Sequence, residues 1–524
     1  MRTGSAVTER RPLEQSSKRR KVRETAELEA LKREAARLDL LFAEDPRAAI
    51  TAARALASTS APEDHGPKMV AAGILVDAGQ ELKDAAAIDE GVAYFRQVHA
   101  VVPASPQLDY NLANGISAQV RFRTDPPWSS ARCAARREAR SLYLRSVALG
   151  KSPKDRSKAH TNHANLLRSS YRMLEAYDAY VAALQEEPKN GVASSGVARL
   201  LLEFVTEGLG PRELTTLAAR YLHHAGASKA EIVELAGPHA LKRIDELSAT
   251  ARGQQPEPRR QPSGFAGFVW RHRLALSVSM ELLNPSRRFW DDLNLGTVSE
   301  PISSGPEIPP VFSMWNVLKA DYAAARWLAY AATQPFRERG AYQDTLDYAN
   351  YGTKQSLVVL AQRAAMDVLD KAAGFASEYL GLPGDPKRTY FVDRWHRGGT
   401  RAAVHLEWQE EVGKELEAGN PGLLALGDLA GDLRSDGPLS HRRLLRHAGT
   451  HRFIVLHDML VGSRSSPYVE HHAENAYEAA TIDTLQLCRA ALFYLRDMVL
   501  WRERRLRAES RGRPRGQMIV PPHH

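Results

Sequence analysis

The sequence predicts an all-α fold that is organised in two parts. Apolar residues recur three and four positions apart in segments such as ARREARSLYLRSVALG and NAYEAATIDTLQLCRAALFYLRDMVLW, which is typical of amphipathic helices. Alternating runs of β-branched residues, which would indicate strands, are nearly absent. Residues 249–264, ATARGQQPEPRRQPSG, break the helical pattern with Pro, Gly, Gln and charge, so we predict a linker between the two parts there.

Length and charge narrow the class of protein. With 524 residues, of which 43% are hydrophobic, the chain can bury two or more cores. A formal net charge of +9 permits an anionic partner such as RNA without requiring one. The two cysteines, Cys133 and Cys488, are far apart in the sequence, which argues against a disulfide framework and fits a reducing compartment. No stretch approaches the roughly 18 apolar residues of a membrane span, so we expect a cytoplasmic protein with no membrane partner.

Both ends of the chain are rich in Arg and poor in apolar residues. ERRPLEQSSKRRKVRE lies near the start and WRERRLRAESRGRPRG near the end. Such segments bury too little apolar surface to order themselves. We therefore predict disordered basic tails at residues 1–25 and 508–524, which serve either as arms that attract phosphate or only as solvated tails.

The first part, residues 26–248, contains repeated helical pairs. When Pro103 and Pro188 are set at the same position of a repeat of roughly 34 residues, five further positions agree in both copies. These are Gly79, Leu82, Gly91, Phe95 and Val98 in the first copy, and Ala164, Leu167, Ala176, Tyr180 and Ala183 in the second. Small residues at the eighth and twentieth places let two antiparallel helices approach closely, and the aromatic residue at the twenty-fourth packs against the next pair. This order resembles the tetratricopeptide family over residues 71–190 and implies a helical solenoid.

Stacked repeats of this kind form a concave groove that can bind a protein or peptide partner. Asn111 with Asn114, and Asn162 with Asn165, recur at matching positions on the helices expected to line the groove. Asn side chains can hold a peptide carboxylate or backbone through hydrogen bonds. Many ordinary repeats carry Asn at the same two positions, so packing and local hydrogen bonds within the helices explain these residues better, and the sequence does not identify the ligand.

The second part, residues 265–507, lacks the usual sequence signatures of several enzyme classes. It has no G-x-x-x-x-G-K-[ST] loop, no G-x-G-x-x-G fingerprint, no G-x-S-x-G elbow and no H-E-x-x-H pair. Hydrolysis of nucleoside triphosphates, hydride transfer and zincin-type proteolysis therefore lose support. The residue types that remain for chemistry are His, Arg and the carboxylates.

Imidazole and guanidinium groups concentrate in LLRHAGTHRFIVLHD, residues 444–458. His447 and His451 are four apart and could bind a metal from one helix face, but the segment VGSRSSP that follows does not promise a fixed third ligand. We therefore expect neither a metal nor a cofactor. For the whole stretch we predict one amphipathic helix and its approach, with an apolar stripe made by Leu444, Leu445, Phe453, Ile454 and Leu456.

The same stretch holds two overlapping pairs with the pattern R-x4-H, Arg446 with His451 and Arg452 with His457. An imidazole can take a proton from a ribose 2′-hydroxyl or give one to a leaving oxygen. A guanidinium, which is always charged, can hold a phosphate and the extra charge of its transition state. Spacing alone does not choose between the pairs, because this Arg-rich region contains further Arg and His residues with four or six residues between them.

Residues 284–507 resemble a HEPN domain, an all-α module whose nuclease members carry R-x4-6-H with Asn, Asp or His directly after the Arg. NPSRRFWDDLNLG, VFSMWNVLKADYAAARWLAY and YQDTLDYANYGTKQSLVVLAQRAAMDVLD look like the subfamily that places this domain behind tetratricopeptide-like helices. RHAGTH fits the rule, and a long amphipathic helix at about residues 470–507 follows it. An acidic insertion at residues 407–436 makes the domain longer than a minimal HEPN bundle.

The resemblance implies a metal-independent endoribonuclease in which Arg446 and His451 are catalytic. It favours this pair because the polar His447 follows Arg446, whereas an apolar residue follows Arg452. It also implies RNA as the substrate, a homodimer in which two motifs face one composite site, and a toxin-like or antiviral defence role.

The sequence also offers further candidate site residues and an alternative function. His447, Arg452 and His457 are possible contacts in the site, and Asp367 and Asp370 are candidates for an orienting carboxylate by analogy. Some HEPN domains do not cleave RNA. The alternative function is a non-catalytic scaffold that binds nucleic acid or nucleotides and other proteins.

Overall fold

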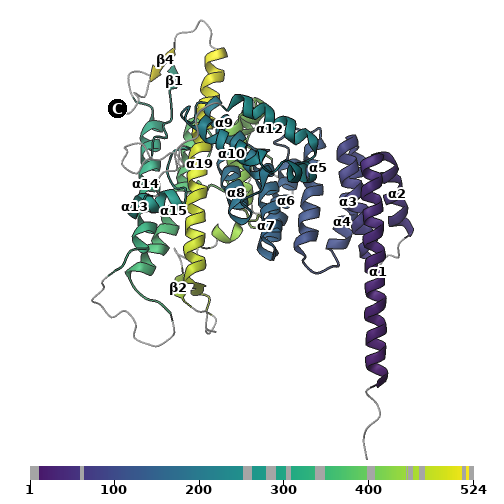
Figure 1. Cartoon of the computed structure of the whole chain (residues 1–524). Helices are drawn as coiled ribbons and strands as arrows, with labels where there is room; N and C mark the ends of the chain where they lie inside the picture. Colours follow the sequence, from purple (N-terminus) through teal and green to yellow (C-terminus); the bar gives the residue numbers. More distant parts are fainter. Residues whose placement is uncertain are drawn as a thin grey trace, which may run out of the picture. The chain divides into compact units, whose positions relative to one another are not determined.

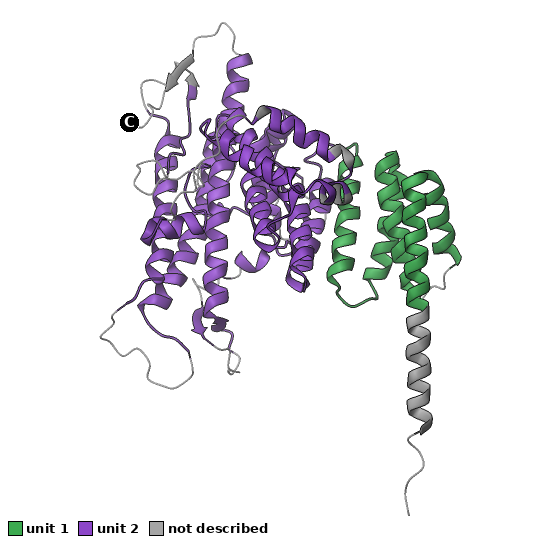
Figure 2. Cartoon of the chain, in the orientation of Figure 1, with its two compact units in different colours: residues 1–125 green, residues 126–524 purple. Residues whose placement is uncertain are grey.

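The computed structural model of the chain describes residues 11–59, 64–251, 262–278, 291–301, 308–336, 349–397, 407–443, 445, 452–458, 466–509 and 515–518. It confirms the predicted all-α class, because helices dominate and the described residues add only two small two-stranded sheets (Figure 1). The chain divides into two compact units, Met1–Asp125 and Pro126–His524 (Figure 2). Within the described residues, no helix has the length and apolar character needed to cross a membrane.

The described part of the first unit is a succession of helices. They are α1 Arg11–Glu44, α2 Pro46–Thr59, α3 His65–Leu82, α4 Ala85–His99 and α5 Pro106–Phe122. Helix α1 takes in much of the tail predicted at residues 1–25, since Lys, Arg and Glu are good helix formers whatever their charge. Residues 1–10 lie outside the described residues.

Close packing of α3 against α4 explains the small residues of the repeat. A Cβ added at Gly91 would lie 2.8 Å from the carbonyl oxygen of Ala72, which is too short for any side chain. Phe95 is buried at 1% exposure, and its ring lies 3.8 Å from the place of a Cβ on Gly115 of α5. The aromatic residue thus packs against the following helix, as the repeat spacing predicts.

The second unit continues this series of helices and then adds the carboxyl-terminal domain. The series comprises α6 Ser130–Leu149, α7 Pro153–Arg168, α8 Met173–Glu186, α9 Gly191–Thr206, α10 Leu214–Gly226, α11 Lys229–Ala236 and α12 Pro238–Thr250. The domain comprises α13 Gly264–Arg271, α14 Pro310–Ala332, α15 Thr353–Leu380, η3 Pro386–Arg388, α16 Glu410–Glu417, α17 Pro421–Asp432 and α19 Glu474–Glu509. Tyr180 repeats the aromatic contact of the first unit, because a Cβ added at Gly196 of α9 would lie 2.5 Å from its ring.

Four short strands complete the described elements. β1 Val298–Pro301 pairs antiparallel with β4 Arg515–Met518, and β2 Phe453–His457 pairs in parallel with β3 Val469–Ala473. Residues 252–261, most of the predicted linker, lie outside the described residues, as do residues 510–514 and 519–524 of the predicted tail. The linker and the carboxyl-terminal tail stay predictions, although β4 lies within the predicted tail.

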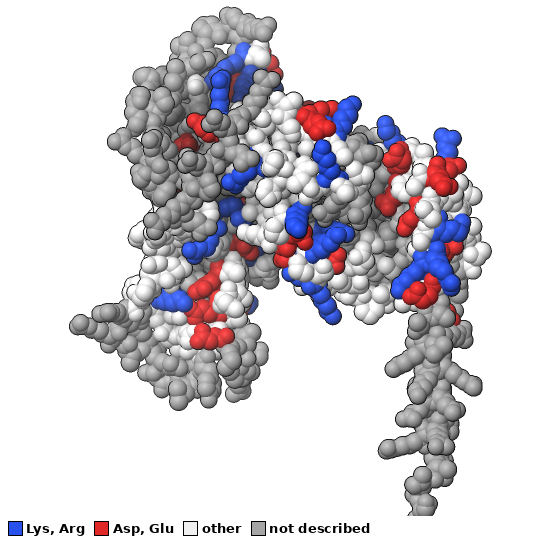
Figure 3. Space-filling model, in the orientation of Figure 1, with Lys and Arg blue, Asp and Glu red and all other residues white. Residues whose placement is uncertain are grey.

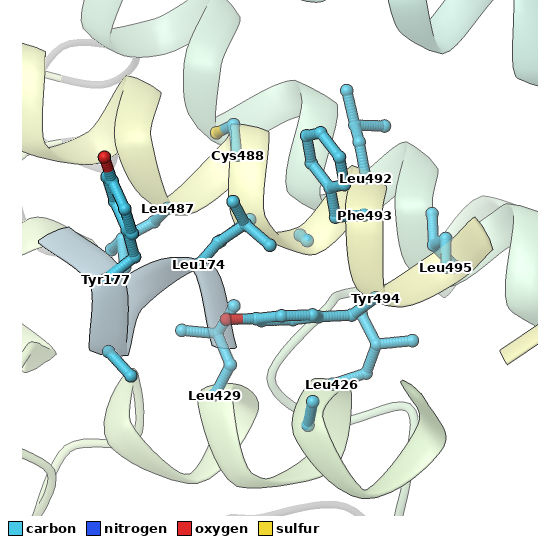
Figure 4. Close-up of a cluster of buried hydrophobic side chains, with 14 of the residues drawn as sticks. Leu174, Tyr177, Leu426, Leu429, Leu487, Cys488, Leu492, Phe493, Tyr494 and Leu495 are labelled. Carbon is cyan, nitrogen blue, oxygen red and sulfur yellow. The ribbon is translucent and has the colours of Figure 1, made fainter. Parts of the chain in front are cut away.

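One hydrophobic core joins helices from both sides of the predicted linker (Figure 4). Leu174 and Tyr177 of α8 belong to the same buried cluster as Leu429 of α17 and as Leu487 and Tyr494 of α19. Helix α8 precedes the linker in sequence, whereas α17 and α19 follow it. The repeat-like helices of the second unit therefore share a core with the carboxyl-terminal domain.

A buried ionic network makes the same connection. Arg136 and Arg140 of α6, with Arg172 at the start of α8, contact Asp428 and Asp432 of α17. The shortest contacts join Arg172 Nη1 to Asp432 Oδ2 at 2.5 Å and Arg140 Nη2 to Asp432 Oδ1 at 2.6 Å, and these side chains are 1–2% exposed. Burial alone would raise the pKa of Asp428, but the three guanidinium groups hold it well below its ordinary value.

The acidic insertion predicted at residues 407–436 thus has a defined place in the fold. It contains α16 and α17, and every residue of α17 from Gly422 to Asp432 is buried. A Cβ added at Gly422 would collide with the backbone of α19, so these two helices cross at backbone contact. Helix α17 of the insertion contacts both α6 and α8.

Limited trypsin treatment is expected to cut the predicted linker after Arg252, Arg259 or Arg260 without separating the two fragments. The fragments should elute as one species in native size-exclusion chromatography and resolve only on a denaturing gel, because α8, α17 and α19 share a core. In concentrated urea they should separate. Two species that elute apart in native buffer would contradict the shared core.

Candidate active site

Residues 453–457 form a strand, and not the predicted helix. β2 runs parallel to β3, with Phe453 opposite Val469 and His457 opposite Ala473. The run FIVL is short, apolar and rich in aromatic and β-branched residues, and the period of so short a run does not distinguish a strand from a buried helix. The prediction of one amphipathic helix through Asp458 is therefore wrong.

The apolar stripe predicted for that helix is wrong for the same reason. Leu445 and Leu456 are buried at 9% and 1% exposure and pack with Tyr477, but Phe453 is 72% exposed. A helical stripe is not expected here, because successive side chains of a strand point to opposite faces. Along β2, the first residue is exposed and the last two are buried. One end of the β2–β3 pair therefore lies at the surface, and the other end is packed into the domain.

The preferred catalytic residues Arg446 and His451, and His447 between them, lie outside the described residues. Their neighbours in the chain are described. Leu445, which precedes Arg446, packs in the small buried cluster, and Arg452, which follows His451, leads directly into β2. The roles of the three residues stay predictions, and the candidate site is described from the residues of β2, β3 and the helix starts that contact them.

His457 ends β2 and meets His471 of β3. The Nε2 of His457 and the Nδ1 of His471 are 2.7 Å apart, and His457 is 2% exposed. A hydrogen bond between two ring nitrogens needs one nitrogen that carries a proton and one that accepts it. The pair therefore fixes both rings against each other at the packed end of the strands.

Glu474, the first residue of α19, collects side chains from the start of α15 and from the residues before it. It accepts hydrogen bonds from Lys354 Nζ at 2.6 Å, from Asn350 Nδ2 at 2.7 Å and from Gln355 Nε2 at 3.2 Å. Asn350 Nδ2 also donates to Asp458 Oδ1 at 2.8 Å. Burial works to raise the pKa of Glu474, yet the three donors hold it below its ordinary value, so the carboxylate is an anion at neutral pH. This cluster joins the end of β2 to α15 and α19.

Arg452 lies at the opposite end of β2, where it forms an ion pair with Glu470 of β3 and is 50% exposed. The overlapping R-x4-H pair would need Arg452 and His457 to meet at one phosphate. The strand separates the Cα atoms of Phe453 and His457 by about 13 Å, and His457 is occupied by His471. Within one chain this geometry does not favour the overlapping pair.

Several site residues were not found from the sequence. Asn350, Lys354 and Gln355 carry no motif, and the only signal for Glu474 is its position at the start of a long helix. Asp370, a candidate for the orienting carboxylate, accepts a hydrogen bond from the backbone N–H of Phe391 at 2.8 Å and lies several turns beyond Lys354 on α15, about 24 Å along the axis.

A metal site is not found in the part of the chain that the structure describes. No group of three or more His, Cys, Asp or Glu within the described ranges is placed to hold a metal ion. His471 and His472 are adjacent on β3, but His472 Nε2 lies 3.4 Å from Glu470 Oε2, whereas His471 contacts His457. The imidazoles of His457, His471 and His472 are thus in contact with protein partners.

The asparagines predicted to bind a partner form local hydrogen bonds. In the first unit, Asn111 Oδ1 accepts from a glutamine one turn earlier on α5 at 2.9 Å, and Asn114 is half-buried. In the second unit, Asn165 Oδ1 accepts from the hydroxyl of Tyr180 at 2.5 Å, and Asn162 Oδ1 accepts from Asn165 Nδ2 at 3.5 Å. A role for these side chains in binding a peptide stays a prediction.

The carboxyl-terminal region is a HEPN domain. Residues 302–502 match the LA2681-like HEPN family, which confirms the resemblance seen in the sequence and takes in β2, β3 and the cluster around Glu474. Among solved structures, the chain is similar to the crystal structure of BtubC (BKLC) from P. vanneervenii, with 16% sequence identity over 45% of this chain and 97% of that chain and a TM-score of 0.23. No curated protein matches the chain.

Proposed function

We propose that the chain is a metal-independent endoribonuclease whose site contains Arg446 and His451. The HEPN domain at residues 302–502 makes RNA or nucleotide chemistry the general expectation. The narrower proposal is supported by the described residues on either side of residues 446–451. This segment connects Leu445, in the buried cluster beside β2, to Arg452 at the exposed start of the same strand.

The proposed reaction uses the RNA's own ribose as the nucleophile. The 2′-oxygen attacks the adjacent phosphorus, the bond from phosphorus to the 5′-oxygen breaks, and the products carry a 2′,3′-cyclic phosphate and a 5′-hydroxyl. His451 takes the proton of the 2′-hydroxyl or gives one to the leaving 5′-oxygen. Arg446 holds the non-bridging oxygens and the charge that develops on them.

A dimer completes this chemistry. One imidazole acts as a base or as an acid in a given step, so a second His451 from a partner copy would supply the other role. The cluster of Glu474 with Lys354 and Asn350 supports the site by fixing the end of β2 to two long helices. We propose that the HEPN domain forms this homodimer and that a protein or peptide partner binds to the repeat-like helices.

Attraction of RNA is proposed to rest on local Arg residues. On the face shown in Figure 3, the described Lys and Arg lie among Asp and Glu, and they do not gather in one basic field. The segment from residue 442 to residue 468 is different, with five Arg and one acidic residue. For such a nuclease we propose a cytoplasmic location and a toxin-like or antiviral defence role.

A comparison of RNA with DNA in the presence of EDTA tests the proposed function. The full chain should cleave a single-stranded RNA oligonucleotide and leave the DNA of the same sequence intact, because only RNA has the 2′-hydroxyl. EDTA should not reduce the rate, since imidazole and guanidinium supply the chemistry. Activity that EDTA abolishes would contradict the metal-independent mechanism. Binding of the RNA and the DNA oligonucleotide without cleavage of either would instead support the non-catalytic scaffold.

A further inference from the structure

We propose that Phe453 and Tyr468 form a platform on which bases of single-stranded RNA stack, directly beside the proposed catalytic segment. The choice of RNA rests on the proposed function, and the platform adds where the substrate's bases bind. Phe453 is 72% exposed and Tyr468 is 69% exposed. Among the described residues, no other large hydrophobic side chain is as exposed as these two.

The two aromatic residues lie at the same end of the β2–β3 pair. The strands are parallel, β3 begins at Val469, and the backbone N–H of Phe453 donates to the carbonyl of Tyr468 at 2.7 Å. Phe453 lies opposite Val469 in the parallel register, so Tyr468 is attached one residue before the position that faces Phe453 across the strands. His451 is the second residue before Phe453 in the sequence. The rings can therefore receive nucleotides that flank the phosphate to be cleaved.

The charge of this segment favours an anionic ligand such as RNA. Residues 442–468 contain five Arg and one acidic residue. That acid, Asp458, already accepts a hydrogen bond from Asn350, and Arg452, next to Phe453, is 50% exposed and pairs with Glu470 of β3. Exposed aromatic rings among Arg residues are an arrangement that binds single-stranded nucleic acid, through stacking and attraction of phosphates.

Binding of a 2′-O-methyl RNA oligonucleotide tests the platform separately from cleavage, because this RNA has no free 2′-hydroxyl. Fluorescence anisotropy with the full chain should show that Phe453→Ala and Tyr468→Ala each raise Kd by about 5- to 150-fold, the range that loss of one stacked base gives. Phe453→Trp should keep the wild-type affinity. Tyr390→Ala removes an aromatic residue of 50% exposure from the segment after α15 and serves as the control, with Kd unchanged within about twofold.

An oligonucleotide that carries abasic sites in place of its central bases identifies stacking as the cause. With this probe, wild type, Phe453→Ala and Tyr468→Ala should bind equally weakly. If the alanine variants lost as much affinity for abasic RNA as for intact RNA, the platform would be overturned. It would also be overturned if their loss of affinity accompanied dissociation of a dimer in size-exclusion chromatography. The latter result would place the rings in a dimer interface.

The test also separates the platform from the nuclease. Wild-type chain that binds the 2′-O-methyl RNA through both rings but leaves unmodified RNA intact would contradict the proposed function and retain the platform. Unchanged binding and cleavage in both alanine variants would retain the nuclease and overturn the platform. Absence of RNA binding by the wild type would overturn both.

Discussion

Replacing Asp432 by alanine should lower the free energy of unfolding by about 3–5 kcal/mol, the usual cost of breaking a buried ion pair. The carboxylate of Asp432 is 2% exposed and receives Arg140 and Arg172, which are each 1% exposed. Without it, two guanidinium groups stay buried with less negative charge to balance them. The midpoint of thermal unfolding, followed by circular dichroism, should fall by several degrees.

A matched control comes from the turn that follows α17. Asp436 pairs with Arg137 at 3.0 Å and with Arg434 at 3.1 Å, but its side chain is 52% exposed, so Asp436→Ala should cost no more than about 1 kcal/mol. Replacing Arg140 and Asp432 together by apolar residues should cost less than the sum of the single changes, because it leaves fewer unpaired charges. If Asp432→Ala were as stable as Asp436→Ala, the network would not hold α6 and α8 to α17.

The largest effect on activity is expected from the proposed catalytic pair. His451→Ala should reduce the rate of RNA cleavage by about 10² to 10⁴, which is the usual contribution of one general acid or base. Arg446→Ala should reduce it by about 10² to 10³ through the loss of charge stabilisation. Initial rates on a labelled RNA oligonucleotide, with wild type and variants at equal concentration, measure both effects.

Control variants distinguish loss of chemistry from loss of structure. His441→Ala removes an exposed imidazole shortly before the same segment and should cleave at the wild-type rate within about twofold. Both catalytic variants should keep the helicity and oligomeric state of the wild type. His457→Ala is expected to act mainly on stability, because it breaks the hydrogen bond between His457 and His471 in a packed position. A folded His451→Ala that cleaves at the full rate would exclude His451 as the acid or base.

Local rules of packing explain the parts of the fold that the sequence predicted. Gly91 and Phe95 could be placed from their spacing because the close approach of α3 and α4 requires a small residue and the next helix requires a bulky one. The helical class followed from periodicity alone. The strand at Phe453–His457 was missed because a run of five residues gives too little period to separate a strand from a helix.

Contacts between residues far apart in sequence could not be predicted in this way. Nothing near Arg140 or Arg172 indicates that their partner is Asp432, which follows more than two hundred residues later. The same holds for the site, where Asn350 and Glu474 meet only because α15, α19 and β2 come together. Arg and His in one short motif were visible in the sequence, whereas the cluster around Glu474 depends on the tertiary fold.

The chemical ends of the cleavage products distinguish attack by the ribose 2′-hydroxyl from hydrolysis by water. Mass spectrometry of fragments from one RNA oligonucleotide, incubated with the full chain in EDTA, should find a 2′,3′-cyclic phosphate on one fragment and a 5′-hydroxyl on the other. The folded double variant His451→Ala, His457→Ala should leave the same oligonucleotide intact. Fragments that end in a 3′-hydroxyl and a 5′-phosphate, or full cleavage by the double variant, would contradict the assignment of this segment as the site of a metal-independent ribonuclease.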